Sequence, residues 1–323
     1  MRVIVSGSDG PVLTRAPIPS PGPDEVLVRV RASALNRADL AMLAGGRHGA
    51  AGGMGAPLGL EWAGDVVEVG EGVTRWRPGD RVMAAGGGAF AEYALGHGRR
   101  IYPAPDGLAY EEAAGLPVGL QTMHDAIATH GRLEAGQSIL IQGASSGVGL
   151  MGLQVARLLG AGRVIGTSTS PARRERLAEF GADLAIDSRA SDWVGRVLDA
   201  TDGQGVDLLI DQVAGAVMTS NLKATRIGGR IVNVGRLAGQ RAEFDFDLHA
   251  LRRITYVGVT FRTRSGAEVE RINELTTQAF WPALREGRLR LPVDRVYPLE
   301  AFAEAFARMA ANQHFGKVVL TPG

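Results

Sequence analysis

The fold is decided by the stretch Ser138-Ile-Leu-Ile-Gln142-Gly143-Ala-Ser-Ser-Gly147-Val-Gly149. Its first five residues form an apolar run of strand length, and the glycines that follow are typical of a tight turn. Apolar residues then recur at helical spacing, at Val148, Met151, Leu153, Val155 and Leu158. At this strand-to-helix junction Gly147-x-Gly149-x-x-Gly152 satisfies the dinucleotide-binding fingerprint. Such glycines let backbone N–H groups approach a pyrophosphate at the positive end of a helix, so we expect a nucleotide site here.

Downstream of this turn, apolar strands and helical stretches alternate. Strands are predicted at 163–166, 184–186, 206–210 and 230–234, and helices at 174–180, around 193–198 and near 218–225. Apolar strands joined by helical crossovers predict a parallel sheet covered on both faces, a doubly wound α/β unit. The run Ile254 to Phe261 is expected to be its last and outermost strand.

The two ends of the chain follow another rhythm. From Val3 to about Leu116, short β-prone runs alternate with Gly and Pro turns, with one helical insert at 37–43, which predicts a mostly β, barrel-like domain. A long helix from Ala267 to Gly287 and a strand from Lys317 to Leu320 do not continue the alternation, so we assign this tail to the first domain. The expected domains are residues 1–119 with 262–323, and residues 120–261.

The composition excludes several classes of protein. Of the 323 residues, 45% are hydrophobic and 21% charged, and no apolar run approaches the roughly 20 residues that span a bilayer. A dispersed net charge of +1 gives no footprint for nucleic acid or an anionic membrane. The lack of cysteine excludes disulfides, cysteine-ligated metal centres and a thiolate nucleophile. The first residues do not resemble a signal peptide, so we expect a cytoplasmic protein.

The end of the second predicted strand indicates which dinucleotide is bound. NAD-binding proteins place an Asp or Glu there for the ribose 2'-hydroxyl, whereas this chain has Thr167-Ser-Thr-Ser170. The hydroxyls can donate to a 2'-phosphate, and Arg173 and Arg174 follow Pro171 on a helix from which they can reach it. We therefore predict NADPH. The alternative is that Ser170 only caps the helix and the arginines form a solvated face.

At this point several segments, taken in order, resemble the medium-chain dehydrogenase/reductase superfamily, and within it the zinc-free quinone oxidoreductase branch that includes zeta-crystallin-like proteins. The resemblance covers essentially the whole chain and implies a GroES-like catalytic domain, built from both chain ends, with a Rossmann cofactor domain inserted between them. The matching segments are Leu35–Asp39, Pro57–Gly64, Pro78–Val82, the turn Leu116–Thr122, the glycine-rich loop, Thr260–Ser265 and Phe315–Leu320.

Two positions bear on metal chemistry. In zinc-containing relatives the first metal cysteine matches Asn36, and the histidine of a Gly-His-Glu motif matches Leu60 in Gly59-Leu60-Glu61. Leucine has no donor atom, and a neutral amide is a poor zinc ligand. We therefore expect no catalytic zinc.

The resemblance also implies the site residues. Asn36 and Thr122 would lie beside the nicotinamide, where a carboxamide and a hydroxyl can orient the ring and hydrogen-bond an oxygen that gains charge; otherwise they are a turn residue and a helix cap. The remaining predicted cofactor residues are Gly143, Ser145, Ser146, Gly147 and Val148 at the pyrophosphate turn, Ser168 and Arg173 at the 2'-phosphate, Gly235 and Phe261 on the nicotinamide side, and Asn312 and Lys317 on the outer cofactor surface.

These assignments lead to three hypotheses. In the first, NADPH delivers hydride to a quinone or an α,β-unsaturated carbonyl and solvent supplies the proton; without a metal, the acceptor must be activated by conjugation. In the second, the protein binds NADPH without turnover, as a structural or RNA-binding module. In the third, it reduces an enoyl group on a carrier-bound acyl chain. An exposed apolar edge strand at 254–261 would need cover, which predicts a homodimer.

Overall fold

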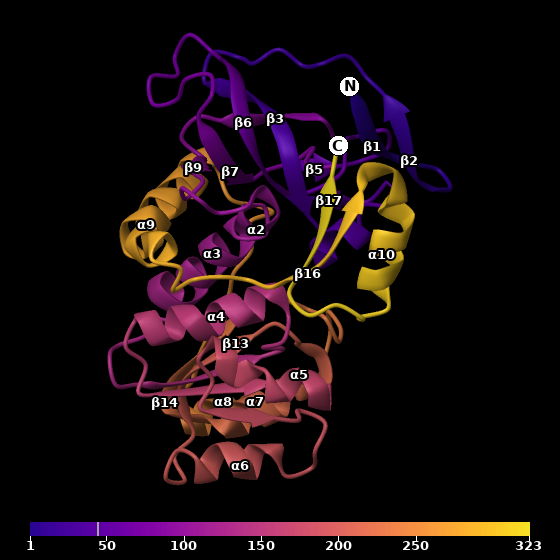
Figure 1. The fold of residues 1–323 in the computed structure, drawn as a ribbon. Helices are drawn as coiled ribbons and strands as arrows, with labels where there is room; N and C mark the ends of the chain where they lie inside the picture. Colours follow the sequence, from indigo (N-terminus) through magenta and orange to yellow (C-terminus); the bar gives the residue numbers. More distant parts are fainter. Residues whose placement is uncertain (44) are drawn as a thin grey trace. The chain divides into compact units, whose positions relative to one another are not determined.

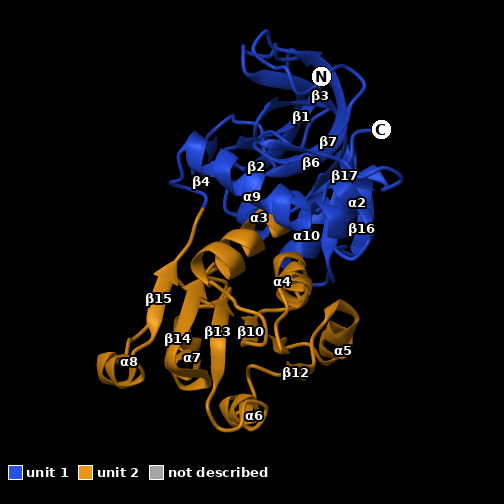
Figure 2. Ribbon diagram, turned by 90° about the vertical axis from the view of Figure 1, so that its left-hand side faces the viewer, with its two compact units in different colours: residues 1–118, 261–323 blue, residues 119–260 orange. Residues whose placement is uncertain are grey.

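The computed structural model describes residues 1–43 and 45–323 and contains two compact units (Figure 2). Unit 1 consists of residues 1–118 and 261–323, and unit 2 consists of residues 119–260. The boundaries expected from the sequence lay between residues 119 and 120 and between residues 261 and 262. Within the described ranges, none of the helices combines the length and the apolar character that crossing a bilayer requires.

Unit 2 contains the predicted doubly wound sheet, which confirms the α/β fold class (Figure 1). All its strand pairs are parallel, in the order β12-β11-β10-β13-β14-β15, which is the order of dinucleotide-binding folds. The strands are β10 (Ser138–Gln142), β11 (Arg163–Thr167), β12 (Leu184–Ile186), β13 (Val206–Asp211), β14 (Thr225–Asn233) and β15 (Thr255–Gly258). The helices are α4 (Gly147–Leu158), α5 (Pro171–Glu175), α6 (Trp193–Asp199), α7 (Met218–Ala224) and α8 (Phe246–Arg252).

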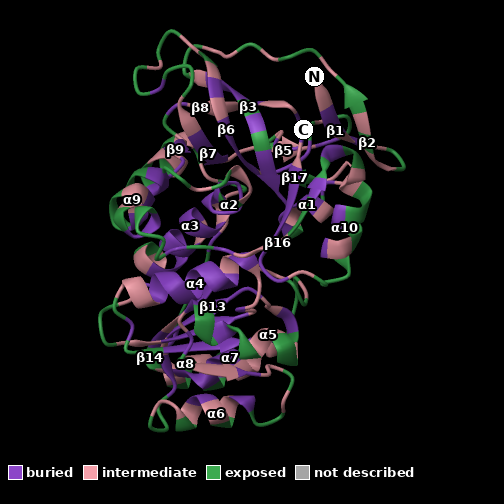
Figure 3. Cartoon of the chain, in the orientation of Figure 1, coloured by how far each residue is buried: buried purple, intermediate pink, exposed green. Residues whose placement is uncertain are grey.

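The apolar runs form the interior of this sheet because both of its faces are covered. Leu140, Ile165, Leu209 and Ile231 come from four neighbouring strands and belong to one buried cluster. Helix α4 packs against β10 and β11 and is buried along most of its length (Figure 3). The turn that precedes α4 is therefore held on a rigid support.

Several predicted elements differ from the structure. The helical insert expected at 37–43 ends at Leu40, and the strand expected at 230–234 spans Thr225–Asn233. The outermost strand was expected over 254–261 but ends at Gly258, because its partner β14 ends at the paired residue Asn233. The predicted helix 174–180 is divided into α5 and a 3-10 turn, Leu177–Phe180. The predicted turn 116–122 is wrong: Pro117, whose ring suits a first helical position, begins helix α3 (Pro117–Met123), and a π-helical stretch follows to His130.

Unit 1 is the predicted mostly β domain. Its main sheet has the order β16-β17-β3-β6-β7-β9, with β8 also paired to β3. Its strands are β1 (Arg2–Gly7), β2 (Gly10–Arg15), β3 (Glu25–Ala34), β4 (Arg47–His48), β5 (Ala51–Gly52), β6 (Glu61–Val69), β7 (Arg81–Ala85), β8 (Tyr93–His97), β9 (Ile101–Pro103), β16 (Val293–Pro298) and β17 (Lys317–Thr321). Its helices are α1 (Arg37–Leu40), α2 (Tyr110–Ala113), α9 (Gly266–Arg285) and α10 (Phe302–Ala310).

The pairing of β17 with β3 joins the two ends of the chain. Val319 lies opposite Ala34 in an antiparallel register, so the last strand brings its first residue, Lys317, close to the segment that follows β3. A buried cluster that includes Trp62, Phe90 and Phe306 supports this sheet. Residues from both chain ends therefore share one core in unit 1.

Candidate functional site

The glycine-rich turn between β10 and α4 presents backbone N–H groups at the start of the helix, where an anion can bind. Ser146 caps α4: its Oγ accepts a hydrogen bond of 3.0 Å from the Gly149 N–H. Gly143 has φ +70°, and a Cβ on Gly149 would lie 2.6 Å from the Gly143 carbonyl oxygen. Gly147 and Val148 are the first two residues of α4, where N–H groups have no partner within the helix. The turn therefore fits a pyrophosphate.

Side chains from neighbouring strands hold the base of this turn. Thr167, at the end of β11, donates from Oγ1 to Gln142 Oε1 at 2.7 Å and accepts from the Gly143 N–H at 3.0 Å. Gln212, which follows β13, donates to the Gln142 carbonyl oxygen at 3.1 Å and accepts from Ser146 Oγ at 3.2 Å. The Thr167 hydroxyl is buried and directed inward, so of the Thr167–Ser170 hydroxyls this one supports the turn rather than facing a ligand.

The residues after β11 form the predicted 2'-phosphate end of the site. Ser168 Oγ donates to Ser145 Oγ at 2.9 Å, so two predicted cofactor residues contact each other. Ser168 Oγ also accepts from the Ser170 N–H at 3.3 Å. Ser170 precedes α5 but makes no side-chain capping hydrogen bond, and Arg173 lies on this helix, half-buried. Ser170 is the N-cap residue of α5, as the alternative expected, and its carbonyl oxygen accepts from the Arg174 N–H at 3.0 Å, although its side chain caps no N–H within the described residues.

Two more arginines lie at this end, one of which the sequence reasoning missed. Arg174 Nη1 donates to the Ser168 carbonyl oxygen at 2.8 Å and pairs with Asp187 at 2.9 Å. Arg189 Nη2 donates to the Thr169 carbonyl oxygen at 2.7 Å. A hydrogen bond from the Arg189 backbone N–H lowers the pKa of Asp187, and both guanidinium groups lower it further.

Three arginines lie at this end. Arg174 and Arg189 both pair with Asp187, and α5 carries Arg173 together with Glu175. Arg189 could have been found from the sequence, because it follows β12, and the carboxyl ends of neighbouring parallel strands meet at one edge of a sheet.

A buried polar cluster surrounds Asn36 in unit 1. Lys317 donates from Nζ to Asn36 Oδ1 at 3.0 Å and forms a close ion pair with Glu61. Asn36 Nδ2 donates to Glu61 Oε1 at 2.9 Å, and Glu61 Oε2 accepts from the Val118 N–H at 3.0 Å. Lys317 is 3% exposed, and its buried charge is neutralised by Glu61. Its contact with the outer side of the cofactor stays a prediction.

Asp39 adds a second carboxyl group to this cluster. Its Oδ2 accepts from the Asn36 N–H at 2.6 Å, whereas Oδ1 has no hydrogen-bond partner in residues 1–43 and 45–323. Burial raises the pKa of Asp39 to about 8, and the nearby Glu61 raises it too, while the Asn36 hydrogen bond and Lys317 act in the other direction. Asp39 therefore keeps its proton at neutral pH.

The other predicted residues fall in both units. In unit 2, Thr122 is half-buried on α3, and a Cβ on Gly235 would lie 2.5 Å from the Gln212 carbonyl oxygen. In unit 1, Phe261 is half-buried beside the Arg264 guanidinium, and the exposed Asn312, with φ +54°, accepts a hydrogen bond from Arg37. Asn36 and Lys317 are thus brought together in unit 1, as are the turn residues and Ser168 in unit 2.

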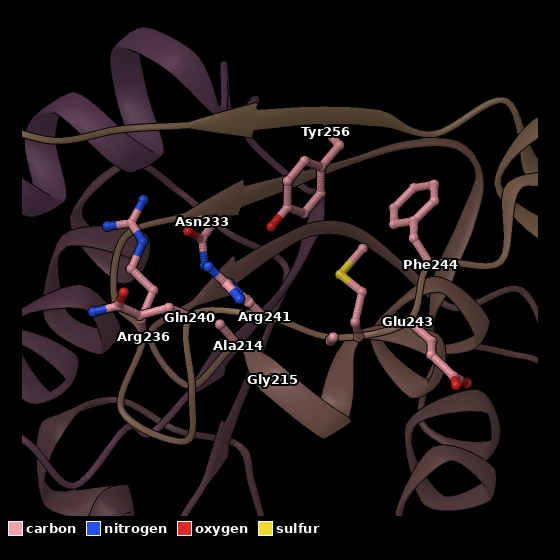
Figure 4. Close-up of a pocket in the computed structure, with 11 residues that line it drawn as sticks. Ala214, Gly215, Asn233, Arg236, Gln240, Arg241, Glu243, Phe244 and Tyr256 are labelled. Carbon is pink, nitrogen blue, oxygen red and sulfur yellow. The ribbon is translucent and has the colours of Figure 1, made fainter.

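Unit 2 also holds a cavity of about 180 Å³ that the sequence reasoning did not find. It lies beside the carboxyl end of β14 and the edge strand β15. In Figure 4 the hydroxyl end of Tyr256 points toward the side that holds Asn233, Arg236 and Arg241, and Phe244 stands on the opposite side. The cavity therefore has amide and guanidinium groups on one side, and Phe244 with the carboxylate of Glu243 on the other.

Comparisons with known proteins agree with this architecture. The family described as alcohol dehydrogenase GroES-like domain matches residues 22–106, and the family described as zinc-binding dehydrogenase matches residues 147–278. A probable oxidoreductase from Mycobacterium abscessus is 30% identical, with 100% of this chain and 99% of that chain covered and a TM-score of 0.87. A quinone oxidoreductase from Pseudomonas syringae is 27% identical, with 99% of each chain covered and a TM-score of 0.87.

A longer relative is also similar. A mycocerosic acid synthase-like polyketide synthase from Mycolicibacterium smegmatis is 32% identical over 303 residues, which cover 93% of this chain. The chain spans only 14% of the length of that protein. Three findings agree: both domain families match, unit 2 has the strand order of dinucleotide-binding folds, and the full chain is similar to a probable oxidoreductase. This chain therefore belongs to the medium-chain dehydrogenase/reductase family of oxidoreductases.

Proposed function

We propose that the protein is an NADPH-dependent, metal-free reductase of a quinone or an α,β-unsaturated carbonyl. The observation that carries the proposal is the buried Lys317 ammonium, which contacts both Asn36 and Glu61. In zinc-containing relatives the residue that matches Asn36 is a metal ligand. An ammonium group at this place repels a divalent cation, and Leu60 offers no ligand atom. An acceptor that no metal polarises must be activated by conjugation.

The preference for NADPH is supported by the charge at the end of β11. Ser168 and Thr169 stand where NAD-binding proteins place a carboxylate, and Arg189 is held beside them by the Thr169 carbonyl oxygen. Guanidinium groups form charge-assisted hydrogen bonds with phosphate. In this proposal Ser168, Arg173 and Arg189 bind the 2'-phosphate, and the turn at Gly143–Gly149 binds the pyrophosphate.

When bound, NADPH supplies a hydride. The chain's own contribution is orientation: Asn36 and Thr122 would lie beside the nicotinamide, as the family resemblance implies. Arg174 is already paired with Asp187, so it supports the segment that binds the 2'-phosphate. Solvent would supply the proton to the reduced acceptor.

A panel of acceptors tests this proposal. We expect NADPH oxidation with quinones and conjugated enones, faster than NADH oxidation. We expect no NADPH oxidation with saturated ketones and no NADP⁺ reduction with alcohols. Treatment with a chelator should leave the rate unchanged. A rate that depends strictly on added zinc, or activity confined to alcohols, would contradict the proposal. Tight NADPH binding without turnover on any acceptor would instead support a non-catalytic binding protein.

A second candidate substrate is an enoyl thioester on an acyl carrier. The specific observation in its favour is the match of nearly the whole chain to a segment of a polyketide synthase. An enoyl thioester is itself an α,β-unsaturated carbonyl, so the chemistry is the same. Enoyl thioesters of N-acetylcysteamine belong on the panel, and a kcat/KM well above that of quinones would select this substrate class.

We also propose a homodimer formed through the edge strand β15. Its outer side is free within the described chain, and Tyr256 is 41% exposed there. Two apolar side chains of the neighbouring α8 are also exposed, Phe246 at 77% and Leu251 at 66%. Pairing of β15 with a second copy would cover the edge and these side chains.

A further inference from the structure

The buried cluster around Asn36 fixes the orientation of a side chain as well as balancing charge. We infer that Lys317 and Glu61 are positioning residues that fix the Asn36 carboxamide in one orientation, with its oxygen left as a hydrogen-bond acceptor for the bound ligand. This inference deepens the proposed function and rests on it, because it assigns a task to the side chain placed beside the nicotinamide.

The orientation of the amide follows from the chemistry of its two neighbours. An ammonium group can only donate, so the atom of Asn36 that lies 3.0 Å from Lys317 Nζ must be the oxygen. An ionised carboxylate can only accept, so the atom 2.9 Å from Glu61 Oε1 must be the nitrogen. Rotating the amide by half a turn would break both contacts at once. The pair therefore excludes the flipped amide.

Glu61 is itself held in place. Its second oxygen, Oε2, accepts from the Val118 N–H at 3.0 Å, and the residue is fully buried at the start of β6. Lys317 is the first residue of β17, whose pairing with β3 fixes its backbone close to Asn36. Both partners of Asn36 thus come from strands of the unit 1 sheet, which is the kind of support that keeps a functional group in one geometry.

The hydrogen-bonding capacity that remains on Asn36 is that of an acceptor. One amide proton goes to Glu61, and the other faces the Ala34 carbonyl oxygen at 3.4 Å. The oxygen has two lone pairs, and Lys317 uses one. Asn36 can therefore accept a hydrogen bond from a hydroxyl or an amide N–H of the ligand. It has no proton to spare for a substrate oxygen that gains charge, so of the two tasks expected from the sequence only orientation fits.

Stability alone does not explain why this pair is present. A buried ion pair gains little over well-packed neutral side chains, because removing two charges from water offsets their attraction. A neutral pair of similar shape, Glu61→Gln with Lys317→Met, should therefore fold. In this double variant the Val118 N–H requires the glutamine oxygen, so the glutamine NH2 faces Asn36 and favours the flipped Asn36 amide, while the cluster keeps its volume.

The test is a mutant cycle on the full chain, with kcat for NADPH oxidation and the Kd of NADPH from fluorescence titration as readouts. The variants are E61Q/K317M, N36A and all three together. We expect E61Q/K317M to unfold within a few degrees of the wild type and to lose roughly tenfold or more in kcat, in the range of a lost oriented hydrogen bond. Because Lys317 and Glu61 act through Asn36, adding N36A to E61Q/K317M should lower kcat by less than about a further twofold.

A matched control uses a carboxylate with the same kinds of partner elsewhere. Asp183 pairs with Arg157 and accepts from the Val164 N–H at 2.7 Å, at the amino end of β11. The variant R157M/D183N should change kcat and the NADPH Kd by less than about twofold. Lys317→Arg, which keeps the charge and the donor, should retain more activity than Lys317→Met.

The inference is wrong if N36A causes its full loss in the E61Q/K317M background, since the residues would then act independently. It is also wrong if E61Q/K317M keeps the wild-type kcat and Kd. Failure of the proposed function would look different. In that case no acceptor would be reduced. The same mutant cycle, read out as the Kd of NADPH, would still show whether Asn36, Glu61 and Lys317 act as a unit.

Discussion

Replacing Asp39 with asparagine should remove one contribution to the dependence of the free energy of unfolding on pH. The Asp39 carboxyl is fully buried, and its pKa is raised from 3.8 to about 8, chiefly by burial. Between these two values the folded protein keeps the proton that the unfolded chain releases. The contribution of Asp39 to stability is thus fully present below about pH 4 and is lost as the pH rises toward 8. Asparagine is neutral at every pH, and its Oδ1 can still accept from the Asn36 N–H.

The magnitude follows from the size of the shift. Each pH unit within the window costs the wild type about 1.4 kcal/mol relative to a side chain that does not titrate. From pH 5 to pH 8 this amounts to about 4 kcal/mol, three times that figure. The free energy of unfolding of D39N relative to the wild type should therefore increase by about 4 kcal/mol across this interval.

Urea unfolding of unit 1 measures this difference. Trp62, Trp76 and Trp281 lie in unit 1 and Trp193 in unit 2, so a W193F background makes tryptophan fluorescence report on unit 1. D39N and its parent are compared in that background at pH 5, 6, 7 and 8.

An oppositely shifted carboxylate provides the control. The backbone and hydroxyl hydrogen bonds from Ser265 lower the pKa of Glu268, so its contribution to stability is present above the unfolded value of 4.5 and is lost as the pH falls through the lower pKa of the folded state. The deficit of E268Q should therefore stay constant from pH 5 to pH 8 and shrink only below pH 4.5, unlike the D39N difference. Parallel stability curves for D39N and its parent from pH 5 to pH 8 would refute the assignment of a buried, protonated Asp39.

Three further predictions concern the proposed cofactor site and the edge strand. Arg189→Ala should raise the Kd of NADPH about tenfold and leave that of NADH unchanged, as expected for one lost charge-assisted hydrogen bond; an equal effect on both cofactors in fluorescence titrations would remove Arg189 from the 2'-phosphate site. Gly149→Ala should weaken NADPH binding and lower the Tm, because the new Cβ would lie 2.6 Å from the Gly143 carbonyl oxygen. The control Gly195→Ala in α6 has open space around the new Cβ, so it should leave NADPH binding unchanged and keep or raise the Tm. Thr255→Lys places a charge on the exposed edge of β15 and should halve the mass measured by light scattering at micromolar concentration, whereas a wild type that is already monomeric would contradict the proposed dimer.

The sequence predicts the parts of the fold that local patterns determine. Strands β10 to β14 are apolar runs separated by helical stretches, so the parallel sheet and the position of the turn at Gly143 follow from neighbouring residues. Helix α8 before β15 was not predicted. The length of β15 does not follow, since it is set by where β14 ends at Asn233. The helix that begins at Pro117 was misread as a turn, although a proline suits the first position of a helix.

The site is predicted less completely because its contacts are long-range. Ser146 and Gly149 are close in sequence, and their hydrogen bond could be expected from a capping pattern. Lys317 and Glu61 are 256 residues apart, and nothing local to Lys317 indicates a buried partner. A lysine is seldom fully buried unless it is paired, so the sequence alone does not predict this buried ion pair. Only the pairing of β17 with β3 brings the two charges together.

The charge state of this cluster bears on which acceptors the protein could reduce. Lys317 and Glu61 neutralise each other, and burial keeps a proton on Asp39, so the surroundings of Asn36 carry no net charge at neutral pH. The one cation is already paired, and the Asn36 amide protons are directed at Glu61 and Ala34. The cluster therefore offers no unpaired cation to stabilise an alkoxide, and the donors that remain, the Asp39 hydroxyl and the third Lys317 proton, are buried. A saturated ketone requires such help in reduction, whereas a conjugated acceptor spreads the incoming charge over its own π-system. The proposed preference for conjugated acceptors thus rests on the hydrogen bonds within unit 1 as well as on the family resemblance.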